Sequence, residues 1–394
     1  MFAKLKNLLA PERKSSRTGR VIAFDAGGHA RWTPRDYAAL AREGYTKNAI
    51  VYRAVRLTAE SVGSLIFALY EGERELTAHP LLDLLRRPNP RQDGPAFLDA
   101  IASHLLLSGN AYIEAVSLPE DGARVRELYA LRPDRMKVVP GPDGWPIAYE
   151  YTVGGRTVRF DQAAAQPPIL QLAAFNPLDD YYGLSALEAA MVAVDTHNAA
   201  ARWNKALLDN AARPSGALVF QNADGPTLAA DQYERLKREL DDQYQGARNA
   251  GRPMLLEGGL DWKPMALTPK DMDFMQAKHA AAREIALAFG VPPMLLAIPG
   301  DNTYSNYSEA NRVFWRQTVL PLGTRIGHAL TQWLAPSFGS EFTLAVDTDA
   351  VEALNPDRAA LWERVTKAPF LTVNEQRAAT GYGPVAGGDA VPAA

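Results

Sequence analysis

The stretch Thr268-Pro-Lys-Asp-Met-Asp-Phe-Met275 opens a segment that runs to Ala335, and this segment decides the fold. Thr268 is a favourable helix N-cap, and the proline after it suits the first helical position. Apolar side chains then recur at three- and four-residue steps, which predicts a helix over 268–290 with one apolar face. That face contains Met272, Met275, Ala282, Ala286 and Phe289. Gly290 supplies a C-cap, and Pro292-Pro293 prevents any continuation.

A polar loop and a second helix complete the segment. The loop is Pro299-Gly-Asp-Asn-Thr-Tyr-Ser305, and the helix is expected to begin near Asn306 with Glu309 as part of a capping box. A long apolar stripe reaches as far as Trp333. Because Pro321 lies inside this stripe, we expect a kink about one turn before it.

Upstream, the pattern is that of an α+β unit. Helices are predicted at 47–64, 80–87 and 95–108, and a short one is expected to begin at Thr33. Short β-branched or aromatic runs lie at 66–70, 111–117, 128–131, 136–139, 147–153, 157–160 and 169–173. Turn signals separate the runs between residues 124 and 174, which predicts an antiparallel meander packed on the preceding helices. A late strand is expected at 342–346.

Another long helix is predicted from Ser185, its N-cap, to about residue 212. Its apolar stripe includes Met191, Val194 and Ala201. A small insertion with strands and a charged helix at 227–245 then separates it from the helix at 268–290. The charged helix mixes both signs, as Arg235, Lys237, Arg238, Asp241 and Asp242 show. A mixed surface of this kind favours a protein–protein contact or a solvated face over a DNA-binding helix.

The composition excludes several classes of function. The chain has 394 residues, a net charge of −3 and no cysteine, so thiolate catalysis, disulfides and cysteine-ligated metals are excluded. No apolar run approaches the roughly 20 residues that span a bilayer. A soluble protein made in the cytoplasm is therefore expected, with no membrane partner. Lysine and arginine predominate in residues 1–20, which predicts a basic flexible arm or a solvated tail.

No catalytic constellation is visible. Gly183-Leu-Ser-Ala-Leu187 is half of a nucleophile elbow, and Ser185 serves better as a helix cap. Asp179 and Asp180 are adjacent, so their side chains diverge and do not form an acid–base pair. The six histidines do not pair at metal-ligand spacing, and no phosphate-binding loop motif is present. We therefore expect a protein that is not an enzyme and that needs no cofactor or metal.

Several motifs, in order, resemble the core signature of tailed-bacteriophage portal proteins, the ring-shaped head–tail connectors. They extend over roughly residues 45–390 and also match the portals of gene transfer agents. The motifs are Arg87-Pro-Asn-Pro90, Leu107-Ser-Gly-Asn-Ala-Tyr112, Gly183-Leu-Ser-Ala-Leu187, Trp262-Lys-Pro264, Phe289-Gly-Val-Pro-Pro-Met-Leu-Leu296, Thr303-Tyr-Ser-Asn306, Leu320-Pro321, Arg325-Ile326, Leu371-Thr372, Asn374-Glu375, Arg377, Gly381, Pro384 and Gly387-Gly-Asp389.

The resemblance implies an α+β portal fold that assembles as a ring. Its divisions would be an N-terminal arm (1–20), a wing (21–183), a first stem helix (184–212), a clip (213–267), a second stem helix (268–290), a turn and tunnel loop (291–308), a kinked helix with a short crown (309–384) and a flexible tail (385–394). The C-terminal part is short, so any crown is small.

The resemblance also implies a dodecameric ring at the head–tail vertex of a phage or phage-like particle, assembled in the bacterial cytoplasm. Double-stranded DNA would pass the tunnel loop Pro299, Gly300, Asp301, Asn302, Thr303, Tyr304 and Ser305. The stem residues Met191, Val194, Ala201, Met272, Met275 and Phe289 would form the subunit interface. Arg235, Lys237, Arg238, Asp241 and Asp242 in the clip would bind the large terminase subunit and the head–tail adaptor, and the major capsid protein would surround the ring. The alternatives are a ring scaffold of another translocation machine and a hydrolase that uses Ser185.

Overall fold

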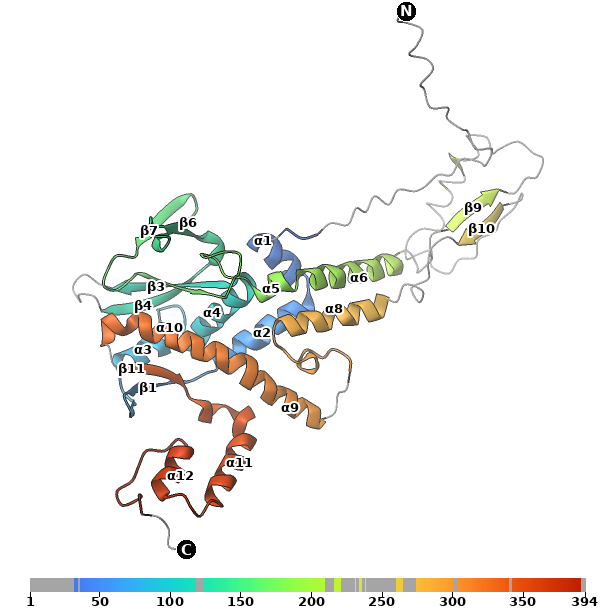
Figure 1. Ribbon diagram of the computed structural model, residues 1–394. Coiled ribbons are helices and arrows are strands. Elements are labelled where there is room, and N and C mark those ends of the chain that lie inside the picture. Colours follow the sequence, from blue (N-terminus) through green and yellow to red (C-terminus); the bar gives the residue numbers. More distant parts are fainter. Residues whose placement is uncertain are drawn as a thin grey trace, which may run out of the picture. The chain divides into compact units, whose positions relative to one another are not determined.

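The computed structural model describes residues 32–34, 36–117, 124–209, 216–220, 231, 234–235, 238, 260–264, 274–300, 304–339 and 342–390 (Figure 1). The chain divides into two compact units. The larger contains residues 33–200 and 275–394, and the smaller contains residues 1–32 and 201–274. In the smaller unit, strands β9 (Gly216–Phe220) and β10 (Leu260–Pro264) form an antiparallel pair.

Two antiparallel-packed helices, α2 (Ala49–Gly63) and α4 (Gly94–Ser108), form the centre of the larger unit. Each has the cap that its sequence offers: the side chains of Asn48 and Asp93 accept backbone hydrogen bonds from the first turns. The facing sides bury residues such as Val55 and Ile101 completely. At Gly63 a Cβ would lie 2.8 Å from the Pro95 carbonyl oxygen, so the close helix contact requires glycine.

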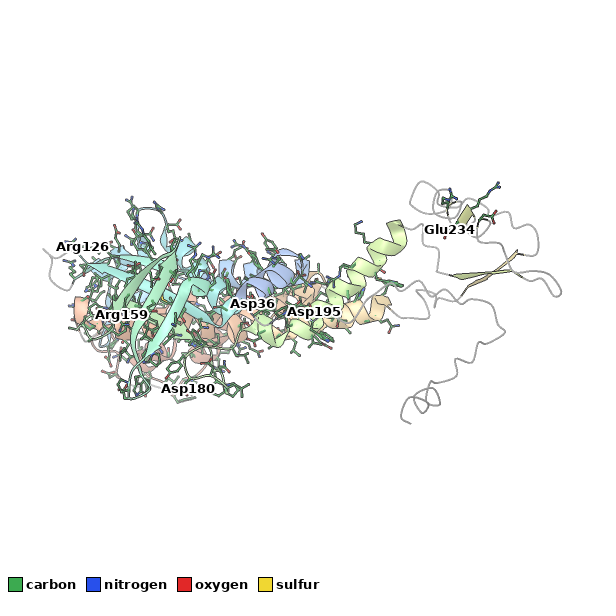
Figure 2. All side chains as sticks on the ribbon, turned by 90° about the horizontal axis from the view of Figure 1, so that it is seen from above. Asp36, Arg126, Arg159, Asp180, Asp195 and Glu234 are labelled. Atoms are coloured by element: carbon green, nitrogen blue, oxygen red, sulfur yellow. The ribbon has the colours of Figure 1, made fainter. Side chains whose placement is uncertain are left out.

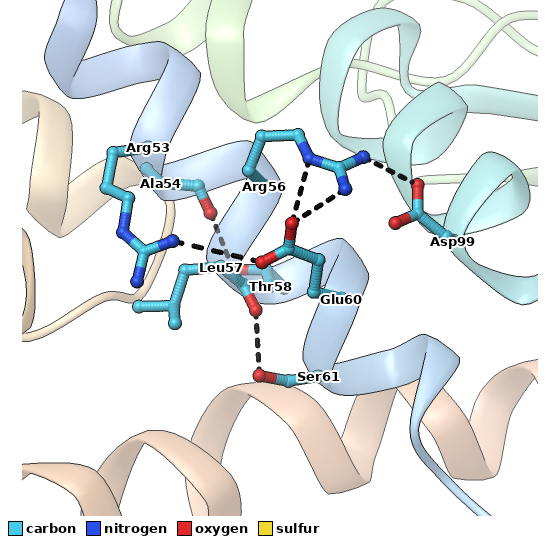
Figure 3. Close-up of polar contacts among 8 residues, drawn as sticks. All are labelled: Arg53, Ala54, Arg56, Leu57, Thr58, Glu60, Ser61 and Asp99. Atoms are coloured by element: carbon cyan, nitrogen blue, oxygen red, sulfur yellow. Dashed lines mark hydrogen bonds and ion pairs between the residues drawn. The ribbon is translucent and has the colours of Figure 1, made fainter. Parts of the chain in front are cut away.

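A charged bridge also joins these two helices at their exposed edge (Figure 3). Arg56 donates to Glu60 one turn further along α2 and to Asp99 on α4, at 2.7 and 3.1 Å. Arg53 lies 3.8 Å from the other oxygen of Glu60. Because these side chains are partly solvated, the bridge contributes modestly to stability and mainly fixes the pairing of the helices.

The prediction of a single five-stranded meander is wrong, because these strands belong to two different sheets. Strands β5 (Met136–Pro140), β6 (Pro146–Val153) and β7 (Arg156–Asp161) do form an antiparallel meander. Strands β4 (Val125–Leu131) and β8 (Ile169–Ala173) instead pair with the two edges of β3 (Asn110–Ser117). Tyr112 on β3 and Tyr149 on β6 meet edge to face, 5.8 Å between ring centroids, and close a small second core between the sheets.

A third sheet joins residues that are far apart in sequence. Strand β1 (Phe67–Glu71) pairs with β2 (Arg74–Leu76) on one edge and with β11 (Phe342–Val346) on the other, both antiparallel. Figure 1 shows β11 beside β1, at opposite ends of the colour scale. Leu69 and Leu344 face each other in the register and are both buried, so this sheet is part of the main core.

The long helix near the C-terminus is interrupted where its proline predicts. Helix α9 (Tyr304–Phe314) continues into a π-helical turn, η6 (Trp315–Val319), and then into α10 (Leu320–Phe338). Pro321 cannot donate a backbone hydrogen bond, and a wider turn before it accommodates that loss. The helix begins at Tyr304, two residues before the expected start at Asn306.

Shorter elements complete the chain. They are α1 (Tyr37–Leu40), η1 (Ala41–Thr46), α3 (Pro80–Arg86), η3 (Pro133–Arg135), η5 (Pro293–Leu296), η7 (Thr348–Ala350), η8 (Glu352–Leu354), α11 (Asn355–Thr366) and α12 (Val373–Ala379). The expected N-cap at Thr33 is wrong: Asp36 caps α1, and Thr33 bonds instead to Asp195. Thr372 and Glu375 form a complete capping box on α12.

Candidate functional site

Two helices, α6 (Met191–Asp209) and α8 (Phe274–Ala288), occupy the stretches predicted as the stem. A one-turn helix, α5 (Ala186–Ala189), precedes α6, and a single residue, Ala190, separates the two with its backbone still in the right-handed helical region. The hydroxyl of Ser185 accepts a bond from the Glu188 amide at 2.9 Å, which confirms the expected cap. Gly290 ends α8 at a φ of 64°, a conformation that glycine adopts freely.

The buried sides of these helices pack into the core of the chain itself. Met191, Val194 and Phe289 are at most 5% exposed, and they belong to the same cluster as Ile285. These three side chains are therefore core residues in this structure, which leaves them no surface to offer a neighbour. Of the other predicted interface residues, Met275 is 57% exposed, Ala201 is half-buried and Met272 lies outside the described residues.

The exposed sides carry two further rows of residues at helical spacing. On α6 the row, called here the α6 outer stripe, consists of Val192, Thr196 and Ala199. On α8 the corresponding α8 outer stripe consists of Ala277, Ala280, Glu284 and Leu287. Val192 is 62% exposed and Leu287 is 80% exposed. Each row thus combines one large exposed apolar side chain with small or polar ones, a composition that suits packing against another protein.

A buried polar junction fixes the base of α6 to the helices that precede it. Asn48, only 2% exposed, donates from Nδ2 to Oδ1 of Asn198 at 3.0 Å and lies 3.2 Å from Nδ1 of His197. Asn198 in turn donates to the backbone oxygen of Glu43 at 2.8 Å. Because the same Asn48 side chain caps α2, one residue joins the cap of one helix to the flank of another.

A second contact lies one turn away on the same helix. The carboxylate of Asp195 accepts from both the backbone and the hydroxyl of Thr33, at 2.9 and 2.6 Å. Figure 2 shows Asp195 near the start of α6, close to Asp36, the residue that caps α1. The sequence does not reveal either contact, because residues about 150 positions apart give no local signal. The sequence does show a run of four polar residues, Asp195-Thr-His-Asn198, which interrupts the apolar start of α6.

His197 is held in its neutral form by its surroundings. Burial lowers the pKa of its imidazole below the ordinary 6.5, and the nearby Lys278 and His279 on α8 lower it further. A neutral ring can accept the Asn48 amide proton at Nδ1, whereas a protonated ring cannot. The junction is therefore matched to a pH near neutrality.

The loop predicted to follow the second stem helix is anchored at its start. Arg283 on α8 donates from Nη2 to the Pro299 carbonyl oxygen at 2.5 Å. A Cβ at Gly300 would lie 2.5 Å from the same nitrogen, so the arginine crosses directly over the glycine. Asp301, Asn302 and Thr303 lie outside the described residues, and Tyr304 and Ser305 are the first residues of α9.

A shallow pocket of about 410 Å³ adjoins this anchor. Its walls come from α8, from the turn after it and from α9, and they include Arg283, Pro293, Met294, Ile298 and Val313. The pocket is mostly apolar, and Glu309 is among the residues that line it. The loop thus starts from a fixed arginine and returns into a fixed helix, with a concave surface beside both.

The charged residues predicted to bind partners are described only in part. Arg235 and Arg238 are helical, as is Glu234, whose backbone oxygen accepts from Nε of Arg238 at 3.2 Å. Figure 2 labels Glu234 among these side chains of the smaller unit. Lys237, Asp241 and Asp242 lie outside the described residues. The predicted role of this set in binding partners therefore stays a prediction.

Within the described parts of the chain, no cluster of three or more His, Asp or Glu side chains could hold a metal ion. No helix there is both long enough and apolar enough to cross a bilayer. Among the histidines of these described parts, His104 has the largest shift: burial lowers its pKa to about 4, and its Nδ1 has no hydrogen-bond partner.

Comparison with known proteins gives concordant matches. The family model "Phage portal protein" matches residues 49–381. The portal protein of Enterobacteria phage HK97 is 24% identical over 353 residues, 86% of this chain and 80% of that protein. A chain from the neck of an empty gene transfer agent (GTA) particle, computed with C6 symmetry, is 54% identical with a TM-score of 0.72, covering 91% of this chain and 98% of that one. A chain from the neck of a native GTA particle, computed with C12 symmetry, is also 54% identical, with a TM-score of 0.69 and coverages of 90% and 95%.

Proposed function

This chain belongs to the phage portal protein family, and from that premise we propose that it forms a twelve-membered portal ring at the head–tail vertex of a phage or gene-transfer-agent particle. The observation that carries this proposal is the 54% identity to a chain in the neck of GTA particles, over nearly the whole length of both chains. The ring acts as a channel for double-stranded DNA and as a docking platform, and it catalyses no reaction.

The ring contacts run through the outer stripes of the stem helices. The α6 outer stripe and the α8 outer stripe are both exposed in the single chain, and both present apolar side chains. In a closed ring every subunit meets its two neighbours with two different surfaces. One subunit's α6 outer stripe therefore packs on the α8 outer stripe of the next, in place of the buried residues Met191, Val194 and Phe289.

The loop 299–305 faces the channel and touches DNA. Its anchoring by Arg283 and its return into α9 support this proposal, because fixed ends allow the few residues between them to protrude. Residues 299–305 contain no lysine or arginine, so each contact with phosphate is weak, as sliding DNA requires. A photo-crosslinker on Asn302→Cys should label DNA in filled particles and not in empty ones. Labelling confined to capsid or tail proteins would contradict this placement.

The clip, residues 213–267, docks the large terminase subunit during packaging and the head–tail adaptor afterwards. The mixed charge of the helix at 227–245 supports this, because complementary charges give specificity to transient contacts. Reversing Arg235, Lys237 and Arg238 to glutamate should leave rings intact and block attachment of the motor or tail. Particles that package and mature normally would argue against this role.

Electron microscopy of the purified chain tests the proposed function directly. Rings with an axial hole wide enough for duplex DNA are expected, and compact monomers at all concentrations would overturn the proposal. The alternative of a hydrolase using Ser185 is disfavoured, because that side chain is 2% exposed and its oxygen caps α5. Ser185→Ala should cost about 1 kcal/mol of stability, as for any cap. A hydrolase would instead lose turnover.

A further inference from the structure

The loop between β8 and α5, residues 174–184, presents two large apolar side chains to solvent. Leu178 is 92% exposed and Phe175 is 84% exposed, the two highest values among the large apolar side chains of the described residues. They are three positions apart, with Pro177 between them. Single exposed apolar residues are ordinary on protein surfaces, but two so close together call for an explanation.

The base of this loop is fixed to the main body of the larger unit. The amide of Ala174 donates to the Gly109 carbonyl oxygen at 2.7 Å. At the other end the amide of Gly183 donates to Oδ1 of Asn110 at 2.9 Å. Gly109 and Gly183 approach so closely that a Cβ on either would lie within 2.5 Å of the other's oxygen. The two ends of the loop are therefore clamped to one turn of backbone.

The tip of the loop is fixed by its own polar side chains. Asn176 donates to the Tyr182 carbonyl oxygen at 2.8 Å and accepts from the Leu178 amide at 3.0 Å. Asp179 accepts from the amides of Tyr181 and Tyr182 at 2.8 and 3.0 Å. With its backbone so constrained, the loop holds Phe175 and Leu178 outward in the free chain.

A further bond ties the loop to the neighbouring sheet. The hydroxyl of Tyr182 accepts from the Val138 amide on β5 at 3.0 Å, and the Tyr181 carbonyl oxygen accepts from Gln171 on β8 at 2.8 Å. Both tyrosine rings pack against the small core between the sheets. The loop thus buries its tyrosines inward and leaves its phenylalanine and leucine outside.

The exposed pair Phe175 and Leu178 is preorganised for binding. Rigid apolar anchors lose little conformational entropy when they dock, so most of the free energy of burying them stabilises the complex. Interfaces concentrate their binding energy in a few such central side chains surrounded by polar ones. The neighbours Asp179 and Asp180 are exposed carboxylates that would form this polar rim. Figure 2 shows Asp180 projecting at the edge of the larger unit.

We propose that Phe175 and Leu178 of one subunit pack against the adjacent subunit of the ring. This inference rests on the proposed ring. Two observations favour a second copy of the chain as the occupant. The loop leads directly through α5 into the α6 outer stripe, so the same chain segment continues into the proposed stem contact. In addition, each copy in a head-to-tail ring meets its two neighbours with two different surfaces, so the exposed pair need not contact the same pair on the next copy.

The native chain contains no cysteine, so single thiols can report on this contact without background. Leu178→Cys would be labelled with a maleimide in dilute free chains and in purified rings. Trp145→Cys, at a position 75% exposed in a turn of another sheet, is the matched control. We expect the thiol at 178 to react readily in free chains and to become protected in rings, whereas the thiol at 145 stays reactive in both.

A second variant tests the energetic contribution. Phe175→Ser with Leu178→Ser should raise the chain concentration at which half of the chains are in rings by about tenfold or more, since loss of central anchors typically costs this factor. Circular dichroism of the free variant should match the native chain, because neither side chain is buried there.

The outcomes separate the two levels of the proposal. If the native chain forms no rings, the proposed function fails. If rings form while the thiol at 178 reacts as fast as in free chains, the ring proposal stands and this inference is overturned. If that thiol is protected only after capsid or tail proteins are added, the occupant is another protein and the inference is likewise overturned. A double variant that assembles at the native concentration also contradicts it.

Discussion

Replacing Asn48 with alanine tests the polar junction at the base of the stem. The side chain has two separate roles: its Oδ1 caps α2 by accepting from the amides of Ile50 and Val51, and its Nδ2 donates to Asn198 and His197. Loss of an N-cap typically costs about 1 kcal/mol. An unsatisfied Oδ1 on Asn198, a residue only 8% exposed, adds about 1–3 kcal/mol. We therefore expect Asn48→Ala to lower the free energy of unfolding by about 2–4 kcal/mol.

Two further variants separate the capping role of Asn48 from its hydrogen bonds to Asn198 and His197. Asp93→Ala removes a cap of the same kind from α4, where the side chain is exposed and accepts only from the Ala96 amide, so about 1 kcal/mol should be lost. Asn48→Asp keeps the capping oxygen but puts a buried carboxylate oxygen opposite Asn198 Oδ1, so it should lose the hydrogen bond to Asn198 and add a desolvation cost. Urea unfolding of each variant, at concentrations below ring formation, gives the differences. If Asn48→Ala is no more destabilising than Asp93→Ala, the hydrogen bonds from Asn48 to Asn198 and His197 contribute nothing to stability. The predicted role of the polar junction is then wrong.

Three other predictions follow from the structure. Burial and the nearby Lys278 and His279 lower the pKa of His197, so the folded chain binds fewer protons at this site than the unfolded chain. The contribution of His197 to the free energy of unfolding is therefore complete above about pH 6.5 and is lost as the pH falls. His197→Gln should make the free energy of unfolding, measured in urea titrations, less dependent on pH in this range. Gly109→Ala should cost about 2–4 kcal/mol, because φ is 73° and the new Cβ would lie 2.4 Å from the Gly183 oxygen, whereas Gly144→Ala, with φ of 84° and open space, should cost only about 1 kcal/mol in the same assay. Leu287→Asp should leave the far-ultraviolet spectrum unchanged and abolish rings in native mass spectrometry, and intact rings would exclude the α8 outer stripe from the subunit contact.

Local sequence signals predicted the helices well, because the residues that cap a helix lie next to its ends in the sequence. The caps at Ser185 and Thr372 form as expected, and Gly109 and Gly290 both adopt the left-handed conformation that terminates a helix. A kink was expected about one turn before Pro321 because proline lacks an amide donor, and the structure has a π-helical turn at that place. Each of these features depends on residues within about one helical turn.

Pairing between distant residues could not be predicted in the same way. The strands between residues 124 and 174 have turn signals that suit one meander, yet β4 and β8 pair with β3, and this arrangement places Leu128 and Leu172 in the main core. Helical periodicity identified the apolar stripe of α6, but it could not show that Met191 and Val194 would be covered by the same chain. The exposed Val192, one residue away, became apparent only from the structure.

The sheet that joins β11 to β1 also has a consequence for the synthesis of the protein. Leu69 is completely buried, and the strand that covers its flank is made about 270 residues later. At roughly 5–20 residues per second, a nascent chain must wait on the order of tens of seconds for that strand. Until then the unpaired edge of β1 remains open to other strands. Crowded polysomes would therefore be the place where this protein is most at risk of aggregation, and only a finished chain can present a closed core to a growing assembly.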